Sequence, residues 1–574
     1  MGAEYPTPAI DALALGGIRL NQSYVLQLCS PSRAALLSSR YSYNIGMDGN
    51  VLVSGDARCI NTTAATLGDR LSRGGVRTAF VGKYDVGYSS WACTANCRGF
   101  DYWLGYYGAA EDYYLHGSKT TLDFHENFAQ APQYRGTYST DLFVRKAIEW
   151  AQNETTSTGA GAGASTPSTL LYLSFQAVHS PIEMPPQNYS HACGHINEPT
   201  RRTYCAMMQA LDCGVANVTS AYKQMGLFDD TVFLFLADNG GMNSEGGFNV
   251  PLRGQKATVW EGGVRSQTFL HWSGFAPSLQ GSVYAGLAHA TDWGVTLEAA
   301  LLGTAAAPNP GEPALDGMNL WPALTSGGAS PRTEMLLSMR DVGQCAAQYR
   351  HECTYAGQLA YRRGKYKLIY GHTALRGSHG GNECQWGPNP KTGAGPAQLN
   401  CWNGWGKPRD VGASRPPPAM PRRPGQPANS SLYSWGALFL YDIENDPLEE
   451  HELSASQPDV VRELTAALEA YIQKGISQDV EHDPGAKTEA CGDGLACAAP
   501  WLPYPSGDRC KAPAPGPAPG PPPPAPGKNC CQCLKEGGGT ACTETKCRRK
   551  GAACVDCIEK GGGSACRRSC GCKK

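Results

Sequence analysis

The part of this sequence that decides its fold is the stretch Leu28-Cys29-Ser30-Pro31-Ser32-Arg33-Ala34-Ala35-Leu36-Leu37-Ser38-Ser39-Arg40. It predicts a turn that runs into a helix, because Ser30 is a favoured cap and Pro31 suits the first helical position. Strong helix formers follow. We therefore expect Cys29 just outside a helix N-terminus, where free backbone N–H groups favour an anion. Arg33, one turn further on, adds a positive fork suited to a tetrahedral oxyanion.

The chain's length and charge limit what it can be. With 574 residues it can bury a large core and should form more than one domain. Its formal net charge of −1 gives no general attraction to nucleic acid or to an anionic membrane. No apolar run reaches the roughly 18 residues that a membrane-spanning helix needs, so we expect no span.

Cysteines and glycosylation motifs favour a secretory route. The 24 cysteines are many for a reducing compartment. Met1 is not followed by the apolar segment of a signal peptide, which we interpret as a missing N-terminus. Together we expect a glycoprotein with disulfide bonds, secreted or lysosome-like. Asn-x-Ser/Thr motifs occur at Asn21, Asn61, Asn153, Asn188, Asn217 and Asn429.

Apolar strands alternate with helices in the first half of the chain. Strands are expected at 76–81, 169–178 and 231–237, with helices between them at 139–152 and 203–225. This alternation predicts an α/β fold with a largely parallel sheet. The strands lead into Lys83, His179 and the Asp238-Asn239 pair. Because ligands bind beyond the carboxyl ends of such strands, these side chains should meet at one site.

Three motifs together resemble the sulfatase family. They are Cys29-x-Pro31-Ser32-Arg33, the run from Gly75 to Tyr84, and the run from Leu252 through Lys256 to Arg265. Arg98-Gly99-Phe100-Asp101 and Glu111-Asp112-Tyr113-Tyr114 are similar to the arylsulfatase B-like branch. The resemblance implies an alkaline-phosphatase-like fold, with a large mixed sheet flanked by helices and a smaller C-terminal antiparallel sheet.

The resemblance also implies a reaction, the hydrolysis of aryl or carbohydrate sulfate esters. A formylglycine-generating enzyme would oxidise Cys29, and the hydrated aldehyde would attack sulfur. Arg33, Lys83 and Lys256 would bind the sulfate oxygens, and His179 would protonate the leaving oxygen. Asp238, Asn239 and the modified Cys29 would bind Ca²⁺, which prefers oxygen ligands.

The sequence departs from the family pattern at two places. Asp85 stands where the family has a histidine beside the formylglycine; a carboxylate there could serve as a base, but it brings negative charge near an anion. The family's first strand, which ends in two metal-binding aspartates, has no counterpart. This predicts a truncated start or weak activity. The alternatives are a phosphodiesterase or phosphonate hydrolase on the same scaffold, or a non-catalytic binder of sulfated glycans.

We expect five parts along the chain. Residues 1–340 form the catalytic α/β domain without its first strand, and 341–485 form an α+β subdomain with a long insertion at 371–434. Residues 486–511 are a cysteine-containing extension, 512–528 a Pro/Ala/Gly linker, and 529–574 a Cys-rich tail. The tail repeats itself with an offset of 24 residues, from Cys530 to Cys554. It is too short for a core, so we expect disulfides, with zinc as the alternative.

Overall fold

The computed structural model describes residues 5–340 except 49–50, 53–55, 57, 158–167, 187–188, 305–307, 309–310 and 313. Beyond residue 340 it describes 358–371, 384–387, 398–401, 437–474, 488–490 and 496–498. All of these belong to the first of two units, residues 1–511 and 512–574. The expected linker at 512–528, the tail at 529–574 and most of the insertion at 371–434 lie outside the described residues.

The described helices have the following bounds: α1 Pro8–Gly16, α2 Cys29–Ser38, α3 Leu67–Arg73, α4 Ser139–Ser157, α5 Pro199–Met225, α6 Glu261–Val264, α7 Ala290–Leu302, α8 Trp321–Ser326 and α9 Pro458–Lys474. The described strands of residues 1–340 are β1 Ile18–Leu20, β2 Ser23–Tyr24, β3 Arg77–Lys83, β4 Tyr102–Tyr106, β5 Thr121–Leu122, β6 His125–Glu126, β7 Ala129–Gln130, β8 Thr169–Ser174, β9 Phe233–Leu236, β10 Thr268–His271, β11 Val283–Tyr284, β12 Ala288–His289 and β13 Glu334–Arg340. Those further along are β14 Gln358–Arg363, β15 Tyr366–Gly371, β16 Cys384–Gly387, β17 Gln398–Cys401, β18 Ala437–Asp442, β19 Thr488–Ala490 and β20 Ala496–Ala498.

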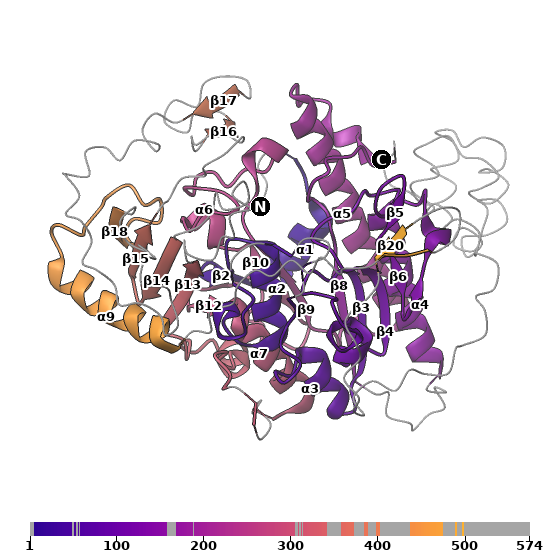
Figure 1. Ribbon diagram of the computed structural model, residues 1–574, viewed down its shortest axis with the longest axis horizontal. Helices are drawn as coiled ribbons and strands as arrows, with labels where there is room; N and C mark the ends of the chain where they lie inside the picture. Colours follow the sequence, from indigo (N-terminus) through magenta and orange to yellow (C-terminus); the bar gives the residue numbers. More distant parts are fainter. Residues whose placement is uncertain are drawn as a thin grey trace. The chain divides into compact units, whose positions relative to one another are not determined.

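Two sheets form the α/β part. One has the order β7-β6-β4-β3-β8, with β4, β3 and β8 parallel, and the other has the order β11-β1-β10-β9. In the second sheet β10 runs antiparallel to both neighbours. The mixed sheets and flanking helices agree with the predicted α/β class (Figure 1). Within the described residues β8 and β9 are both edge strands.

Helices cover both faces of these sheets. On one face Trp150 of α4 and Val218 of α5 pack against Leu171 and Phe233. On the other, Ala34 and Leu37 of α2 join a cluster with Phe80 of β3, while α7 lies against α2 and α3. Strands covered on both faces are apolar throughout, which explains why β3 and β8 read as continuous hydrophobic runs.

The start of α2 differs from the prediction. The helix begins at Cys29 itself, and Leu28 is its cap residue without a side-chain cap hydrogen bond. Ser30 therefore does not cap the helix, and Cys29 is not outside it. The Ser30 hydroxyl instead accepts from the backbone N–H of Leu52 and donates to Asp85. Tertiary contacts have overridden the local capping preference.

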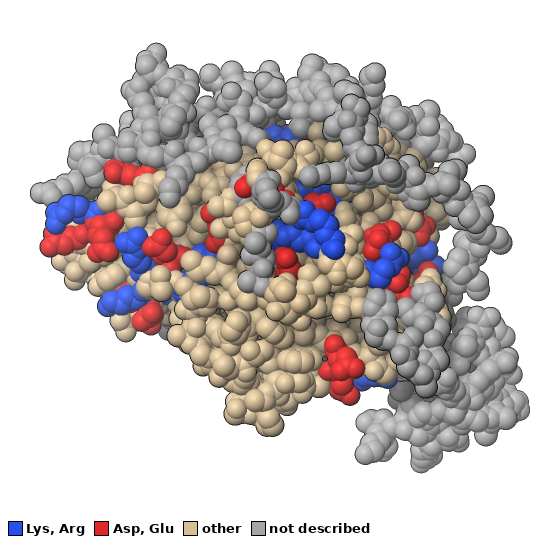
Figure 2. Space-filling view, turned by 90° about the horizontal axis from the view of Figure 1, so that it is seen from below, with Lys and Arg blue, Asp and Glu red and all other residues tan. Residues whose placement is uncertain are grey.

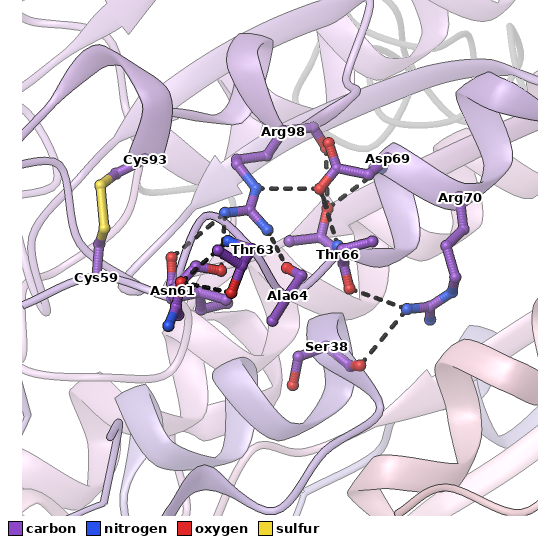
Figure 3. A network of polar contacts seen from close by, with 12 residues as sticks. Ser38, Cys59, Asn61, Thr63, Ala64, Thr66, Asp69, Arg70, Cys93 and Arg98 are labelled. Carbon is purple, nitrogen blue, oxygen red and sulfur yellow. Dashed lines mark hydrogen bonds and ion pairs between the residues drawn. A yellow bond between two sulfur atoms is a disulfide. The ribbon is translucent and has the colours of Figure 1, made fainter. Parts of the chain in front are cut away.

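A polar network fixes α3 beside the 3₁₀ turn at Ala95–Arg98 (Figure 3). Thr66 and Asp69 form a reciprocal capping box, so two N-terminal donors of α3 are satisfied. Arg98 donates to Asp69 over 3.1 Å and to the carbonyl of Ala64. The nearby Cys59–Cys93 disulfide closes the same region, and Cys193–Cys205 is a second described disulfide. These contacts hold the chain that enters β3, the strand that ends at Lys83.

A separate antiparallel sheet, the C-terminal sheet, has the order β13-β14-β15-β18. The helix α9 covers one face through Leu464, Leu468 and Ile472. The other face packs on the α/β part, where Phe439 and Tyr441 contact Trp260. The strand β13 belongs to this sheet although it precedes residue 341. Further along, the described strand β20 pairs in parallel with β5 of the α/β part.

The face drawn in Figure 2 shows no single dominant charge. On the face drawn in Figure 2, blue and red groups lie next to each other, and a broad tan area beside them carries neither. No helix among the described residues is both long and apolar enough to cross a membrane.

Candidate active site

Cys29 lies fully buried at the first position of α2, with charged and polar groups around its sulfur. The Nζ atom of Lys256 is 3.1 Å from Sγ, and Oδ1 of Asn239 is 3.3 Å from it. Lys256 and Asn239 lie more than 200 residues away in sequence. The site therefore depends on the tertiary fold, and it places a cation and an amide oxygen beside the predicted nucleophile.

Arg33 joins the carboxyl ends of three strands. Its Nε donates to Oδ2 of Asp238 over 2.9 Å, beyond the end of β9. Its Nη1 donates to the Ser174 hydroxyl over 2.6 Å and to the Lys83 carbonyl over 2.9 Å, the last residues of β8 and β3. The convergence of strand ends expected from the sequence is thus present. The guanidinium is used mainly to hold these ends together.

Lys83 and Asp85 form a buried pair. Lys83 Nζ is 3.4 Å from Oδ2 of Asp85 and has no hydrogen-bond acceptor among the described residues. The other oxygen of Asp85 accepts from the Ser30 hydroxyl over 2.6 Å. Burial raises the pKa of Asp85 to about 6, although the charges of Lys83 and Arg33 oppose the shift. The Lys83 ammonium group is therefore suited to bind one more anionic oxygen.

His179 is held as a neutral base. Its Nε2 lies 2.7 Å from Lys256 Nζ, and its Nδ1 lies 2.7 Å from the Ser180 carbonyl. Because the carbonyl can only accept, Nδ1 carries the proton and Nε2 accepts from the ammonium group. Burial, with the charges of Lys83 and Lys256, lowers the pKa of His179 to about 3. Burial opposes the charge on Lys256, but Cys29 and Asp238 raise its pKa overall.

Backbone contacts bring Lys256 to this place. Its N–H donates to the Gly241 carbonyl over 3.0 Å, and the N–H of Ala257 donates to the Gln27 carbonyl over 2.8 Å. The loop that carries Lys256 is thus tied both to the segment after Asp238 and to the segment before Cys29.

Two hard oxygen donors follow each other after β9: the amide oxygen of Asn239 contacts Cys29 Sγ, and the carboxylate of Asp238 contacts Arg33. Arg33, Lys83 and Lys256 offset the burial of Asp238 and lower its pKa well below the usual range, so it is ionised as a cation ligand must be. Calcium takes about six to eight oxygens. The described residues contain no group of three or more His, Cys, Asp or Glu that could hold a metal. Asp238 and Asn239 offer two oxygen ligands, fewer than calcium takes.

Two residues of this site were not predicted for their actual roles. Ser174 joins Arg33 to the carbonyl of Lys83, over 2.6 and 2.8 Å. Ser30, expected as a helix cap, holds Asp85. For Ser174, the sequence offers only a weak signal, a small hydroxyl residue at the end of the apolar run 169–174. For Ser30, no local pattern signals its contact with Asp85, because Asp85 is 55 residues away in sequence.

The comparisons with known proteins define the class of this protein as a sulfuric ester hydrolase. The sulfatase family model matches residues 1–303, more than half of the chain. The chain belongs to the sulfatase family.

Named relatives agree with this assignment. Arylsulfatase J of Mus musculus is 30% identical over 490 residues, covering 83% of this chain and 73% of that protein. Arylsulfatase A of Homo sapiens is 27% identical and covers 85% and 88%. The solved structure of Ps i-CgsB in complex with k-i-k-neocarrahexaose has a TM-score of 0.63 at 23% identity, covering 84% of this chain and 91% of that one. At this identity the structural likeness shows the fold alone.

Proposed function

We propose that this sulfatase hydrolyses carbohydrate sulfate esters with Cys29, converted to formylglycine, as its nucleophile. The observation that carries the proposal is the position of Lys256 Nζ, 3.1 Å from Cys29 Sγ and 2.7 Å from His179 Nε2. An oxygen in place of the sulfur would lie beside both a cation and a proton relay. Two similar proteins support a sugar substrate, the one solved with neocarrahexaose and the N-acetylgalactosamine-6-sulfatase of Mus musculus.

Each cation has a separate part in this proposal. Lys83 and Lys256 bind sulfate oxygens and offset the negative charge that repels a nucleophile. Arg33 keeps Asp238, Ser174 and Lys83 in place. When the ester bond breaks, the leaving oxygen takes a proton from the Lys256–His179 pair, in which the proton rests on Lys256. Hydrated formylglycine, when present, supplies the attacking oxygen.

Asp85 acts in this proposal as a positioning residue. Its oxygens contact Ser30 and Lys83, and neither has a described contact to Cys29. It orients Lys83 and competes with the sulfate for its charge. The base function that its place in the motif suggests has less support.

The first test replaces each of two cysteines of the described part of the chain, Cys29 and Cys213. Cys29 is buried and Cys213 is exposed, so Cys213→Ala is a matched control for Cys29→Ala. After co-expression with a formylglycine-generating enzyme, mass spectrometry of the Cys29 peptide should show the aldehyde. Hydrolysis of 4-nitrophenyl sulfate should fall at least 10³-fold in Cys29→Ala, within the range set by nucleophilic catalysis, and stay unchanged in Cys213→Ala. Faster hydrolysis of 4-nitrophenyl phosphate than of the sulfate would instead favour the phosphoester alternative.

We also propose a calcium ion beside Asp238 and Asn239, and a glycosylated chain in the secretory route. Millimolar CaCl₂ should raise the unfolding temperature of the protein, because a ligand bound only by the native state stabilises it. Asp238→Asn should lose this increase, whereas MgCl₂ should give none. An unchanged unfolding temperature in CaCl₂ would contradict the metal proposal.

The four described motif asparagines, at positions 21, 61, 153 and 217, are exposed and open to glycosylation.

A further inference from the structure

One loop carries two of the groups that contact Cys29. It runs from residue 239, after β9, to residue 256, before α6. The amide oxygen of Asn239 lies 3.3 Å from Cys29 Sγ, and Lys256 Nζ lies 3.1 Å from the same atom. A displacement of about 1 Å at a reacting group can lower a rate about 100-fold. The spacing between the two ends of this loop therefore matters for the reaction.

The side chain of Asn249 ties the two ends of the loop together. Its Oδ1 accepts from the N–H of Gly241 over 2.8 Å, and its Nδ2 donates to the Gly241 carbonyl over 2.9 Å. The same Nδ2 donates to the Gly254 carbonyl over 3.2 Å. Gly241 comes two residues after Asn239, and Gly254 comes two residues before Lys256. One carboxamide thus joins the start of the loop to its end.

The Gly241 carbonyl is the point that these contacts share. It accepts from Asn249 Nδ2 over 2.9 Å and from the backbone N–H of Lys256 over 3.0 Å. A carbonyl oxygen has two lone pairs, so both donors can be satisfied at once. The backbone of Lys256 therefore takes its position from the residue that Asn249 holds by two hydrogen bonds.

An asparagine suits this position because its short side chain offers a donor and an acceptor together. Aspartate has the same shape, but its carboxylate would face the carbonyls of Gly241 and Gly254 with no proton to donate. Glutamine would keep both groups on a chain one carbon longer. Each replacement therefore changes the spacing of the loop ends in a different way.

Other contacts hold the rest of the loop independently of Asn249. The guanidinium of Arg201, on α5, lies over the Phe248 ring, 4.1 Å from its centre. The backbone N–H of Asn243 donates to the side-chain oxygen of Gln255 over 2.8 Å. A change at Asn249 should therefore alter the spacing of the loop ends without unfolding the loop.

We propose that Asn249 is a positioning residue for the reaction, which sets the place of Lys256 relative to Asn239. The inference rests on the proposed function, in which the Lys256–His179 pair gives a proton to the leaving oxygen. Asn249 acts through the backbone of Gly241 and not by contact with the substrate. Lys256 Nζ and His179 Nε2 are 2.7 Å apart, and a shift of this pair harms proton transfer to the leaving oxygen. The cost is greatest for esters whose leaving oxygen is most basic.

The test compares 4-nitrophenyl sulfate with phenyl sulfate as substrates of the matured enzyme. Nitrophenolate leaves readily without a proton, whereas phenolate is a stronger base, with a pKa of about 10 as for tyrosine. The measured quantity is kcat/KM for 4-nitrophenyl sulfate divided by kcat/KM for phenyl sulfate. In Asn249→Asp we expect kcat/KM to fall about tenfold for 4-nitrophenyl sulfate and about 100-fold for phenyl sulfate. The ratio of the two values should thus rise about tenfold.

Two further variants accompany Asn249→Asp. Lys256→Arg keeps the positive charge but does not give up a proton, so it should also raise the ratio. Asn96→Asp is the matched control, because Asn96 is half-buried like Asn249 and its amide donates to the Phe100 carbonyl over 3.2 Å. It makes the same chemical change outside the loop. We expect it to keep the ratio of the wild type.

The outcomes separate this role from the proposed function. An unchanged ratio in Asn249→Asp with a raised ratio in Lys256→Arg would overturn the role of Asn249 and leave the proposed function intact. An unchanged ratio in Lys256→Arg would overturn the proton source and this inference with it. An equal rise in Asn96→Asp would mean a general loss of order and also overturn the role. If Asn249→Asp does not fold, Asn249→Gln replaces it, with an expected rise of about threefold and the same consequence if the ratio is unchanged.

Discussion

At the scale of single residues, Asp85 sets how the site responds to pH. Its carboxylate shares Lys83 with the incoming sulfate, and burial raises its pKa to about 6. As the pH falls through about 6 it gains a proton, and Lys83 is released to bind the sulfate. We therefore expect KM for a sulfate ester to fall as the pH is lowered from 7.5 to 5. Asp85→Asn should show the lower KM throughout, by roughly tenfold at pH 7.5, since one nearby charge is removed.

Steady-state kinetics of the matured enzyme across this pH range is the measurement. Asp123→Asn is the control, because burial also raises the pKa of Asp123 to about 6, while its carboxylate accepts from the N–H groups of Tyr107 and Gly108. It should keep the pH dependence of the wild type. A pH-dependent KM in Asp85→Asn equal to that of the wild type would remove Asp85 from this role.

At the scale of elements, the close approach of β3 and β8 depends on Gly82. Its φ is +116°, and a Cβ atom there would lie 1.9 Å from the Ser174 carbonyl oxygen. Gly82→Ala must therefore separate two paired strands just before Lys83. Gly136 also has a positive φ, +88°, but open space around it, so Gly136→Ala reports the backbone strain alone, about 1–3 kcal/mol. We expect Gly82→Ala to lower the free energy of unfolding by clearly more, measured by urea denaturation. Equal losses would show that strand contact is unimportant there.

At the scale of the whole molecule, a buried charge cluster joins the C-terminal sheet to the α/β part. Lys367 of β15 lies 2.9 Å from Glu261 of α6 and 2.8 Å from Glu449. Burial and the charge of Glu261 raise the pKa of Glu449 to about 7, although Lys367 opposes this. An unfolded glutamate has a pKa of about 4.3. The native state thus binds the extra proton, and this stabilisation is complete below pH 4.3 and is lost as the pH rises through 7.

The expected result is a decrease in unfolding temperature from pH 5 to pH 8 that is smaller in Glu449→Gln than in the wild type. Glu450→Gln, at the exposed neighbouring position, is the matched control and should keep the full decrease. Differential scanning calorimetry at the two pH values gives the answer. If Glu449→Gln and the wild type lose the same number of degrees, the cluster does not take up a proton in this range.

The sequence predicted those features that are encoded locally or by family motifs. The helix predicted from residue 139 begins at Ser139, the helix predicted to residue 225 ends at Met225, and Lys83 lies at the end of its strand as expected. Longer-range effects were missed. The strands predicted at 169–178 and 231–237 are shorter in the structure, at Thr169–Ser174 and Phe233–Leu236. The departure of Ser30 from its capping role, and the pairing of His179 with Lys256, depend on contacts that no local pattern contains.

The contact between Trp260 and the C-terminal sheet has a consequence for how such a protein can be rearranged. Trp260 follows Lys256 by four residues, and the rings of Phe439 and Tyr441 lie 5.7 and 5.8 Å from its own. The loop that supplies the active-site ammonium group is thus held by residues encoded some 180 positions later. The loop with Lys256 and the C-terminal sheet cannot be exchanged between homologues independently of each other. A chimera is expected to work only if the tryptophan and its aromatic partners come from the same parent.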